Sequence, residues 1–91
     1  MSWYVYLLRC SDGSLYCGIT TDLPRRIVEH NEGIGSRYTR SRRPVRLTWS
    51  SRKSSKSEAA KAEFHIKRLP REKKELLVAQ KYARGESRTG S

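Results

Sequence analysis

The sequence has few cysteines, and their number limits what can hold the chain together. Cys10 and Cys17 are the only two, too few for a disulfide scaffold or a four-thiolate zinc site. A mixed zinc site would also need His30 and His65, yet the chain has no C-x-x-C and no H-x-x-x-H pair. We therefore expect reduced cysteines in strands and no structural zinc.

Long apolar runs are also missing. Residues 1–10 lack a basic leader region, and their apolar run is too short to span a bilayer. The expectation is a cytoplasmic protein with no membrane partner. A chain of 91 residues suits one domain with one core, which we place at residues 1–84, followed by a polar tail over 85–91 that we expect to be disordered.

Negative charge is absent between Glu32 and Glu58, although the whole chain carries a formal charge of +11. A basic field of this density attracts a polyanion and releases its counterions. The predicted partner is nucleic acid, with DNA as first choice and RNA as second; an anionic membrane or mere solubility is the weaker alternative. The residues predicted to bind the phosphate backbone are Arg37, Arg40, Arg42, Arg43, Arg46 and Arg52.

The N-terminal half predicts a hairpin, a helix and a third strand. Aromatic and β-branched runs over 3–9 and 15–20 flank turn residues. Thr21 and Asp22 can cap a helix that ends near 31–35, and the basic segment 36–43 lacks periodicity and is predicted as a loop. A strand over 45–51 follows, with Val45, Leu47 and Trp49 expected on one face.

The C-terminal half predicts two helices. Residues 55–58 form a capping box, followed by apolar residues at helical spacing. Pro70 suits the first turn of the last helix, which we expect Gly85 to stop. The order is then β-β-α-β-α-α, an α+β fold with a small three-stranded antiparallel sheet flanked by helices.

Five side chains on this scaffold are candidates for phosphodiester chemistry. Tyr6 and Tyr16 come from the hairpin, and Arg26 and His30 are i, i+4 neighbours on one helix face. Glu63 falls within the apolar arc of the second helix, formed by Ala59, Ala60, Ile66 and Leu69. A carboxylate there needs a partner, such as a metal ion or an arginine.

These residues resemble the GIY-YIG nuclease family. Tyr4-Val5-Tyr6 and Tyr16-Cys17-Gly18, separated as the two signature tripeptides are, precede Arg26 in a helix that also holds His30, and Glu63 follows in a later helix. Tyr4 stands where that family usually has glycine, and Cys17 where it has isoleucine. The sequence is most similar to the small stand-alone bacterial YhbQ-like (UPF0213) members, and next to Slx1-type structure-specific nucleases.

The resemblance implies a metal-dependent DNA endonuclease acting on structured or damaged DNA, expected as a monomer. Tyr16 would take a proton from the attacking water, and Arg26 would balance charge on the phosphoryl oxygens. His30 and Tyr6 would orient water and phosphate, and Glu63 would hold one Mg²⁺ or Mn²⁺. Gly18 is expected as a structural motif residue that lets backbones approach closely.

Alternatives stay open at this point. The fold could serve as a nucleic-acid-binding module with little or no catalysis, or, ranked last, as a small RNA- or ribosome-associated protein. Taken singly, the two tyrosines are ordinary strand residues and His30 an ordinary core histidine. Glu63 could simply pair with Lys67.

Overall fold

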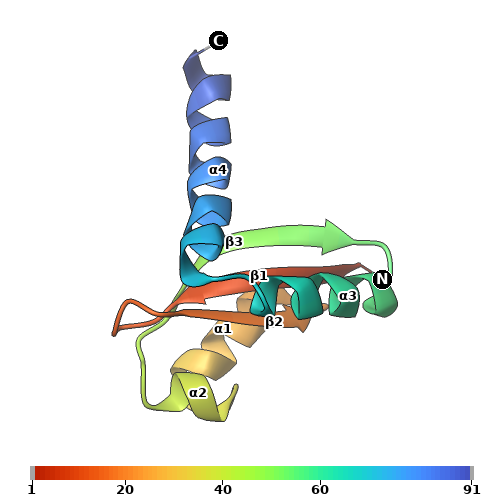
Figure 1. Cartoon of the computed structure of the whole chain (residues 1–91). Coiled ribbons are helices and arrows are strands. Elements are labelled where there is room, and N and C mark those ends of the chain that lie inside the picture. The colour runs from red at the N-terminus through yellow and green to blue at the C-terminus, as the bar shows by residue number, and fades with distance from the viewer. Residues whose placement is uncertain (1, 91) are drawn as a thin grey trace.

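The computed structural model describes the backbone of residues 2–90 and the side chains of residues 2–80. Figure 1 shows how the strands and helices of these residues are arranged. The elements in chain order are β1 (Trp3–Arg9), β2 (Leu15–Thr20), α1 (Leu23–Asn31), α2 (Arg37–Arg40), β3 (Arg46–Lys53), α3 (Lys56–Lys67) and α4 (Arg71–Gly90). This order, with its antiparallel sheet, confirms the predicted α+β fold; the one-turn helix α2 is an addition to it.

The sheet has the order β2-β1-β3, with β1 in the centre. Alternate side chains of a strand point to opposite faces, and both faces of β1 are covered. Val5 and Leu7 pack with Ile66 of α3, whereas Tyr6 and Leu8 pack with residues that include Ile27 of α1. In Figure 1, α1 and α2 lie together on one side of the sheet. The side of Tyr6 and Leu8 is called the α1 face below, and the other side the α3 face.

A β-bulge in β3 overturns one expectation about the sheet. Leu7 pairs with Trp49 and Leu8 with Leu47, so Thr48 is the extra residue. The bulge reverses the alternation, and Leu47 and Trp49 consequently pack on opposite faces. The prediction that they share a face with Val45 is therefore wrong for Trp49. The hydroxyl of Thr48 donates to the carbonyl oxygen of Leu7 at 3.1 Å, which holds the bulge.

The segment predicted as a loop contains the helix α2. Ser36 caps it, because its hydroxyl oxygen accepts a hydrogen bond from the amide of Thr39 at 3.1 Å. Hydrophobic periodicity cannot reveal a helix of four residues. The capping residue was the available signal.

The other helices begin as predicted. Asp22 accepts from the amide of Arg25 at the start of α1, and Ser55 accepts from the amide of Glu58 at the start of α3. Within the part of the chain whose secondary structure is described, no helix is long and apolar enough to cross a membrane.

The end of α4 differs from the expectation. The helix continues through Gly85 to Gly90, so Gly85 does not stop it. A single glycine lowers helix stability by only about 1 kcal/mol relative to alanine, and no proline follows it. The side chains of 81–91 lie outside the described residues. The division into a domain over 1–84 and a disordered tail over 85–91 stays a prediction.

Candidate active site

A buried hydrogen-bonded chain lies between the α1 face of the sheet and helices α1 and α2. The hydroxyl of Tyr6 lies 2.9 Å from Nε2 of His30, and Nδ1 of His30 lies 2.8 Å from Oγ1 of Thr39. Thr39 is in turn 2.9 Å from the hydroxyl of Ser36. Tyr6 is 1% exposed, and His30 and Thr39 are fully buried. Both ring nitrogens of His30 are thus engaged, so His30 itself cannot contact a substrate.

Burial sets the protonation states of this chain. It raises the pKa of Tyr6 to about 12, although the positive charge of Arg26 acts in the opposite direction. Burial, followed by the charge of Arg26, lowers the pKa of His30. Tyr6 and His30 are therefore both neutral at neutral pH. Tyr6 serves as a fixed hydrogen-bonding partner, and because it stays protonated at neutral pH it is not available as a base.

Two glycines, which have no side chain, leave space for the buried rings of Tyr6 and His30. A Cβ on Gly18 would lie 2.5 Å from the hydroxyl of Tyr6, and a Cβ on Gly35 would lie 2.4 Å from Nδ1 of His30. Separations below 3.0 Å force a shift, and the two rings are buried and cannot move away. The backbone around Gly18 and Gly35 thus packs directly against the Tyr6–His30 pair.

The ring of Tyr16 is held between two other rings. It meets His30 edge to face, with centroids 5.2 Å apart, and stacks on Tyr38 with centroids 5.8 Å apart. Tyr16 is partly exposed. Among residues 2–80, no side chain or backbone group hydrogen-bonds to its hydroxyl, in contrast to the hydroxyl of Tyr6. Tyr16 therefore has a fixed ring and a free phenol.

Arg26 borders the same group from α1. One of its nitrogens, Nη1, lies 3.0 Å from Oε1 of Glu29, and Nη2 donates to the carbonyl of Gly35 at 3.0 Å. Its side chain is 32% exposed. Burial alone would lower the pKa of Arg26, but the contacts with Glu29 and Tyr6 raise it. The guanidinium is thus permanently charged and fixed beside Tyr6, with some of its five N–H donors still free.

Glu63 does not join these four residues. It lies on α3 beside Cys17, whose pKa rises to about 12 through burial and then through the charge of Glu63. Cys17 and Tyr16 are neighbours in β2 and point to opposite faces. The partner of Glu63 is Lys67, with Oε2 and Nζ 3.3 Å apart. The strand β2, at the edge of the sheet, lies between Glu63 and Tyr16.

A divalent metal can be tested against this donor set. Within the described residues, no three His, Cys, Asp or Glu side chains gather closely enough to hold an ion. The carboxylate of Glu63 is 24% exposed, and its partner Lys67 is a flexible, exposed side chain. Such a carboxylate fits Mg²⁺ bound by one protein ligand, water and substrate phosphate. It does not fit a metal enclosed by protein ligands.

The comparison with known families identifies the family to which the chain belongs. Residues 2–76 match the family described as the GIY-YIG catalytic domain. The chain belongs to the GIY-YIG family. This is a nuclease family, so the chain carries a nuclease-type domain.

Individual relatives agree with this assignment. A UPF0213 protein of Cupriavidus necator is 52% identical over 79 residues, covering 87% of this chain and 86% of the relative. The solution NMR structure of a UPF0213 protein from Bacillus halodurans has a TM-score of 0.59 at 51% identity, covering 89% and 86% of the two chains. The NMR structure of a protein from E. faecalis has a TM-score of 0.62 at 41% identity, covering 91% and 88%. These matches confirm the predicted resemblance to UPF0213 proteins.

Four of the six arginines predicted to bind phosphate lie between residues 37 and 43 of this GIY-YIG domain, and they fall into two groups. Arg37 and Arg40 are exposed on α2, and neither forms an ion pair with a side chain of residues 2–80. Arg42 and Arg43 instead bond to the protein: Arg42 to Asp12, and Arg43 to the carbonyl of Arg40 at 2.8 Å. The sequence could not separate these groups, because consecutive arginines in an irregular segment look alike.

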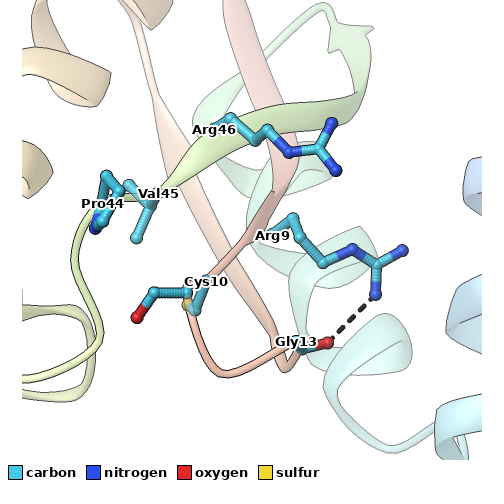
Figure 2. Close-up of a pocket in the computed structure, with 7 residues that line it drawn as sticks. Arg9, Cys10, Gly13, Pro44, Val45 and Arg46 are labelled. Carbon is cyan, nitrogen blue, oxygen red and sulfur yellow. Dashed lines mark hydrogen bonds between the residues drawn. The ribbon is translucent and has the colours of Figure 1, made fainter.

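Arg46 and Arg52 lie on opposite faces of the sheet. Arg46 pairs with Arg9 and Arg52 with Tyr4, at positions of opposite alternation in β1. Figure 2 shows Arg46 beside Arg9, at a hollow near the hairpin turn. Arg52 bonds to the hydroxyl of Ser2 at 2.8 Å, near the other end of β3. One straight nucleic-acid backbone on the α1 face would therefore not meet Arg46.

Sequence reasoning missed three residues of the site: Gly35, Tyr38 and Thr39. Thr39 fixes His30, Tyr38 stacks on Tyr16, and Gly35 makes room for His30. The spacing of Ser36 and Thr39 was a capping signal for a helix that brings Tyr38 and Thr39 to the site. Nothing in the sequence pointed to the contact between Gly35 and the imidazole.

Proposed function

We propose that this GIY-YIG domain is a metal-dependent endonuclease that hydrolyses phosphodiester bonds in DNA, with Tyr16 as its proton-transfer group. The observation that carries the proposal is the environment of Tyr16. Its ring is fixed against His30 and Tyr38, while its hydroxyl is free of any partner within residues 2–80. A group that moves a proton needs this combination of a defined position and an available oxygen.

In this proposal the neighbouring residues act through Tyr16 or on the phosphate. His30, held by Tyr6 and Thr39, supports the ring of Tyr16 from inside the protein. The guanidinium of Arg26 balances the charge that develops on the phosphoryl oxygens, using donors that Glu29 and Gly35 leave free. The oxygen of Tyr16 accepts a proton from the attacking water while the phenol releases its own proton to solvent, so that Tyr16 relays one proton.

Glu63 is the residue that would hold the ion, Mg²⁺ or Mn²⁺, once its carboxylate leaves Lys67. The bound ion would supply Lewis-acid polarisation of the phosphoryl group. Glu63 and Tyr16 approach β2 from its two faces, and β2 is an edge strand. We therefore place the scissile phosphate at this edge, where both side chains are closest to a common ligand.

The substrate in this proposal is DNA, and RNA is the second choice. Arg37 and Arg40 lie on the same short helix as Tyr38, so a backbone bound by α2 passes close to Tyr16. Contacts of this kind give affinity and register but little sequence choice. Preference for structured or damaged DNA, a monomeric state and a cytoplasmic location belong to the same proposal.

The test is cleavage of labelled linear, flapped and four-way-junction DNA with and without Mg²⁺ or Mn²⁺. Tyr16→Phe removes the phenol oxygen and keeps the ring, and Glu63→Gln removes the charge and keeps the shape. Tyr4→Phe and Glu72→Gln are the matched controls, because Tyr4 is at the end of β1 and Glu72 is exposed on α4.

Metal-dependent cutting that is lost in Tyr16→Phe and Glu63→Gln, and kept in both controls, supports the proposal. Loss of roughly 100-fold or more is the expected size for a proton-transfer group. Tight DNA binding with no cutting by the wild type would contradict it. The domain would then be a binding module on a nuclease fold, with the Glu63–Lys67 pair left as a structural contact.

A further inference from the structure

Arg42 contacts both Tyr38 of α2 and the turn between β1 and β2. Its Nε lies 3.0 Å from Oδ2 of Asp12, and its carbonyl accepts from the amide of Ser11 at 2.9 Å. Its Nη1 donates to the carbonyl of Tyr38 at 2.9 Å, and its guanidinium carbon lies 3.9 Å from the centroid of the Tyr38 ring. The contacts with Asp12 and Ser11 join Arg42 to the turn between β1 and β2. The other two hold Tyr38 in place.

The turn provides a rigid anchor for this arginine. Asp12 also accepts from the amide and the hydroxyl of Ser14, at 3.0 and 2.6 Å. These bonds hold the carboxylate of Asp12 in place independently of Arg42. A planar guanidinium that combines a fixed carboxylate with an aromatic face has little freedom left.

We propose that Arg42 is a positioning residue for the reaction, and that it fixes Tyr16 through Tyr38 instead of binding DNA phosphate. The inference rests on the proposed role of Tyr16. The ring of Tyr38 lies against both Arg42 and Tyr16, at 3.9 Å and 5.8 Å between the relevant centres. Without Arg42, the exposed Tyr38 loses the contacts that hold it on Tyr16.

This role differs from that of the neighbouring Arg40. Both arginines belong to the basic segment, but Arg40 is exposed and forms no ion pair within the described side chains. Arg42 has its charge balanced by Asp12. A phosphate contact by Arg40 would release counterions, whereas a neutralised Arg42 has little to contribute to that release.

The experiment compares Arg42→Gln with Arg40→Gln in DNA affinity over a range of salt concentrations and in single-turnover cleavage. For Arg40→Gln we expect weaker binding and a salt slope smaller by about 1. For Arg42→Gln we expect an affinity and a slope close to those of the wild type, with cleavage slower by roughly 10- to 100-fold. An equal loss of slope in both variants would overturn the proposal.

Asp12→Asn gives a second and opposite signature. Removal of a negative charge leaves DNA binding unchanged or tighter, since the net positive charge grows. If Asp12 anchors the positioning chain, cleavage nevertheless slows. Tyr38→Leu should resemble Arg42→Gln, and Tyr38→Phe, which keeps the ring, should lose less activity than Tyr38→Leu. Wild-type cleavage rates in Asp12→Asn and Tyr38→Leu would contradict the inference.

The ring contact itself can be measured without cleavage. Nuclear Overhauser effects between the rings of Tyr16 and Tyr38 should be present in the wild type and weak in Arg42→Gln and Asp12→Asn. Circular dichroism establishes that each variant is folded. If the wild type does not cut DNA, the proposed function fails on its own. Ring contacts unchanged in both folded variants would overturn the role of Arg42 whatever the cleavage result.

Discussion

Nε2 of His30 lies 2.9 Å from the hydroxyl oxygen of Tyr6, and neither side chain exposes more than 1% of its surface. A buried polar group without a partner is costly, so each of these two depends on the other. The pair also connects β1 to α1. This hydrogen bond therefore acts together with the apolar packing of Ile27 to hold the helix that carries Arg26 against the central strand.

Gly35→Ala should destabilise the protein by roughly 1–3 kcal/mol, the range for overpacking a tightly packed interior. The added Cβ would lie 2.4 Å from Nδ1 of His30 and 2.8 Å from its Cα. The backbone atom cannot move aside without shifting α1. Chemical denaturation measures the free energy of unfolding for this comparison.

The double variant His30→Ala, Gly35→Ala tests whether the imidazole of His30 is the group that the added Cβ meets. Removal of the imidazole takes away the atom nearest to the new Cβ, so Gly35→Ala should be less harmful in the His30→Ala background than in the wild type. Equal losses in the two backgrounds would show that the imidazole is not the obstacle at Gly35.

The stability of the protein should fall as the pH is lowered below 6.5, because of His30. Burial and the charge of Arg26 lower the pKa of His30 from its ordinary value of 6.5, with Glu29 acting in the opposite direction. Above that value the imidazole is neutral in both states. Below it, the unfolded chain takes up a proton first, binds more protons, and is favoured. The decline continues down to the lowered folded-state pKa.

The free energy of unfolding, measured by urea denaturation between about pH 5 and about pH 7.5, checks this prediction. The carboxylates whose pKa is lowered, such as Glu29, titrate below this range. His30→Gln keeps a donor and an acceptor but does not titrate, and should flatten the pH dependence. His65→Gln, at an exposed position of α3, should retain it. A slope that survives in His30→Gln would assign the effect to another group.

The sequence predicts the layers of this fold well and the contacts of its site less well. The aromatic and β-branched runs over 3–9 and 15–20 and the capping residues Asp22 and Ser55 define elements from local chemistry alone. The bulge at Thr48 escapes prediction because it is a property of strand pairing, which involves β1 as much as β3. One extra residue then reverses which face Trp49 covers.

For the candidate site, likewise, the sequence could name residues but not their contacts. Tyr6, Tyr16, Arg26 and His30 could be named from their residue types and from the resemblance to the GIY-YIG family, and the structure brings them to one face. Glu63 could be named too, but Lys67, four residues later, is its present partner. Whether an arginine binds phosphate or protein depends on distant residues such as Asp12, 30 positions from Arg42. Local sequence does not contain that information.

Thr48→Val should destabilise the protein by about 1 kcal/mol, the typical value for one hydrogen bond with a buried acceptor. The substitution keeps the shape of the side chain but removes the hydroxyl that donates to the carbonyl of the buried Leu7. Denaturant unfolding gives the difference. Ser57→Ala, on the exposed surface of α3, should change stability far less. Equal stability of Thr48→Val and the wild type would mean that the bulge does not depend on this bond.

The ion pair between Arg9 and Glu75 should contribute a measurable coupling free energy to stability, and salt should weaken it. Nη1 and Nη2 of Arg9 lie 2.6 and 2.7 Å from the two oxygens of Glu75, a two-pronged contact from β1 to α4. Because Glu75 is 35% exposed, solvent screens the pair, and we expect about 0.5–1 kcal/mol from a double-mutant cycle with Arg9→Met and Glu75→Gln. The coupling should shrink at high salt. The same cycle with Arg25→Met and Glu29→Gln is the matched control, since that pair lies within one helix turn and joins no two elements. A coupling no larger than in the control would indicate that α4 is held by the apolar contacts of Leu77 and Val78 alone.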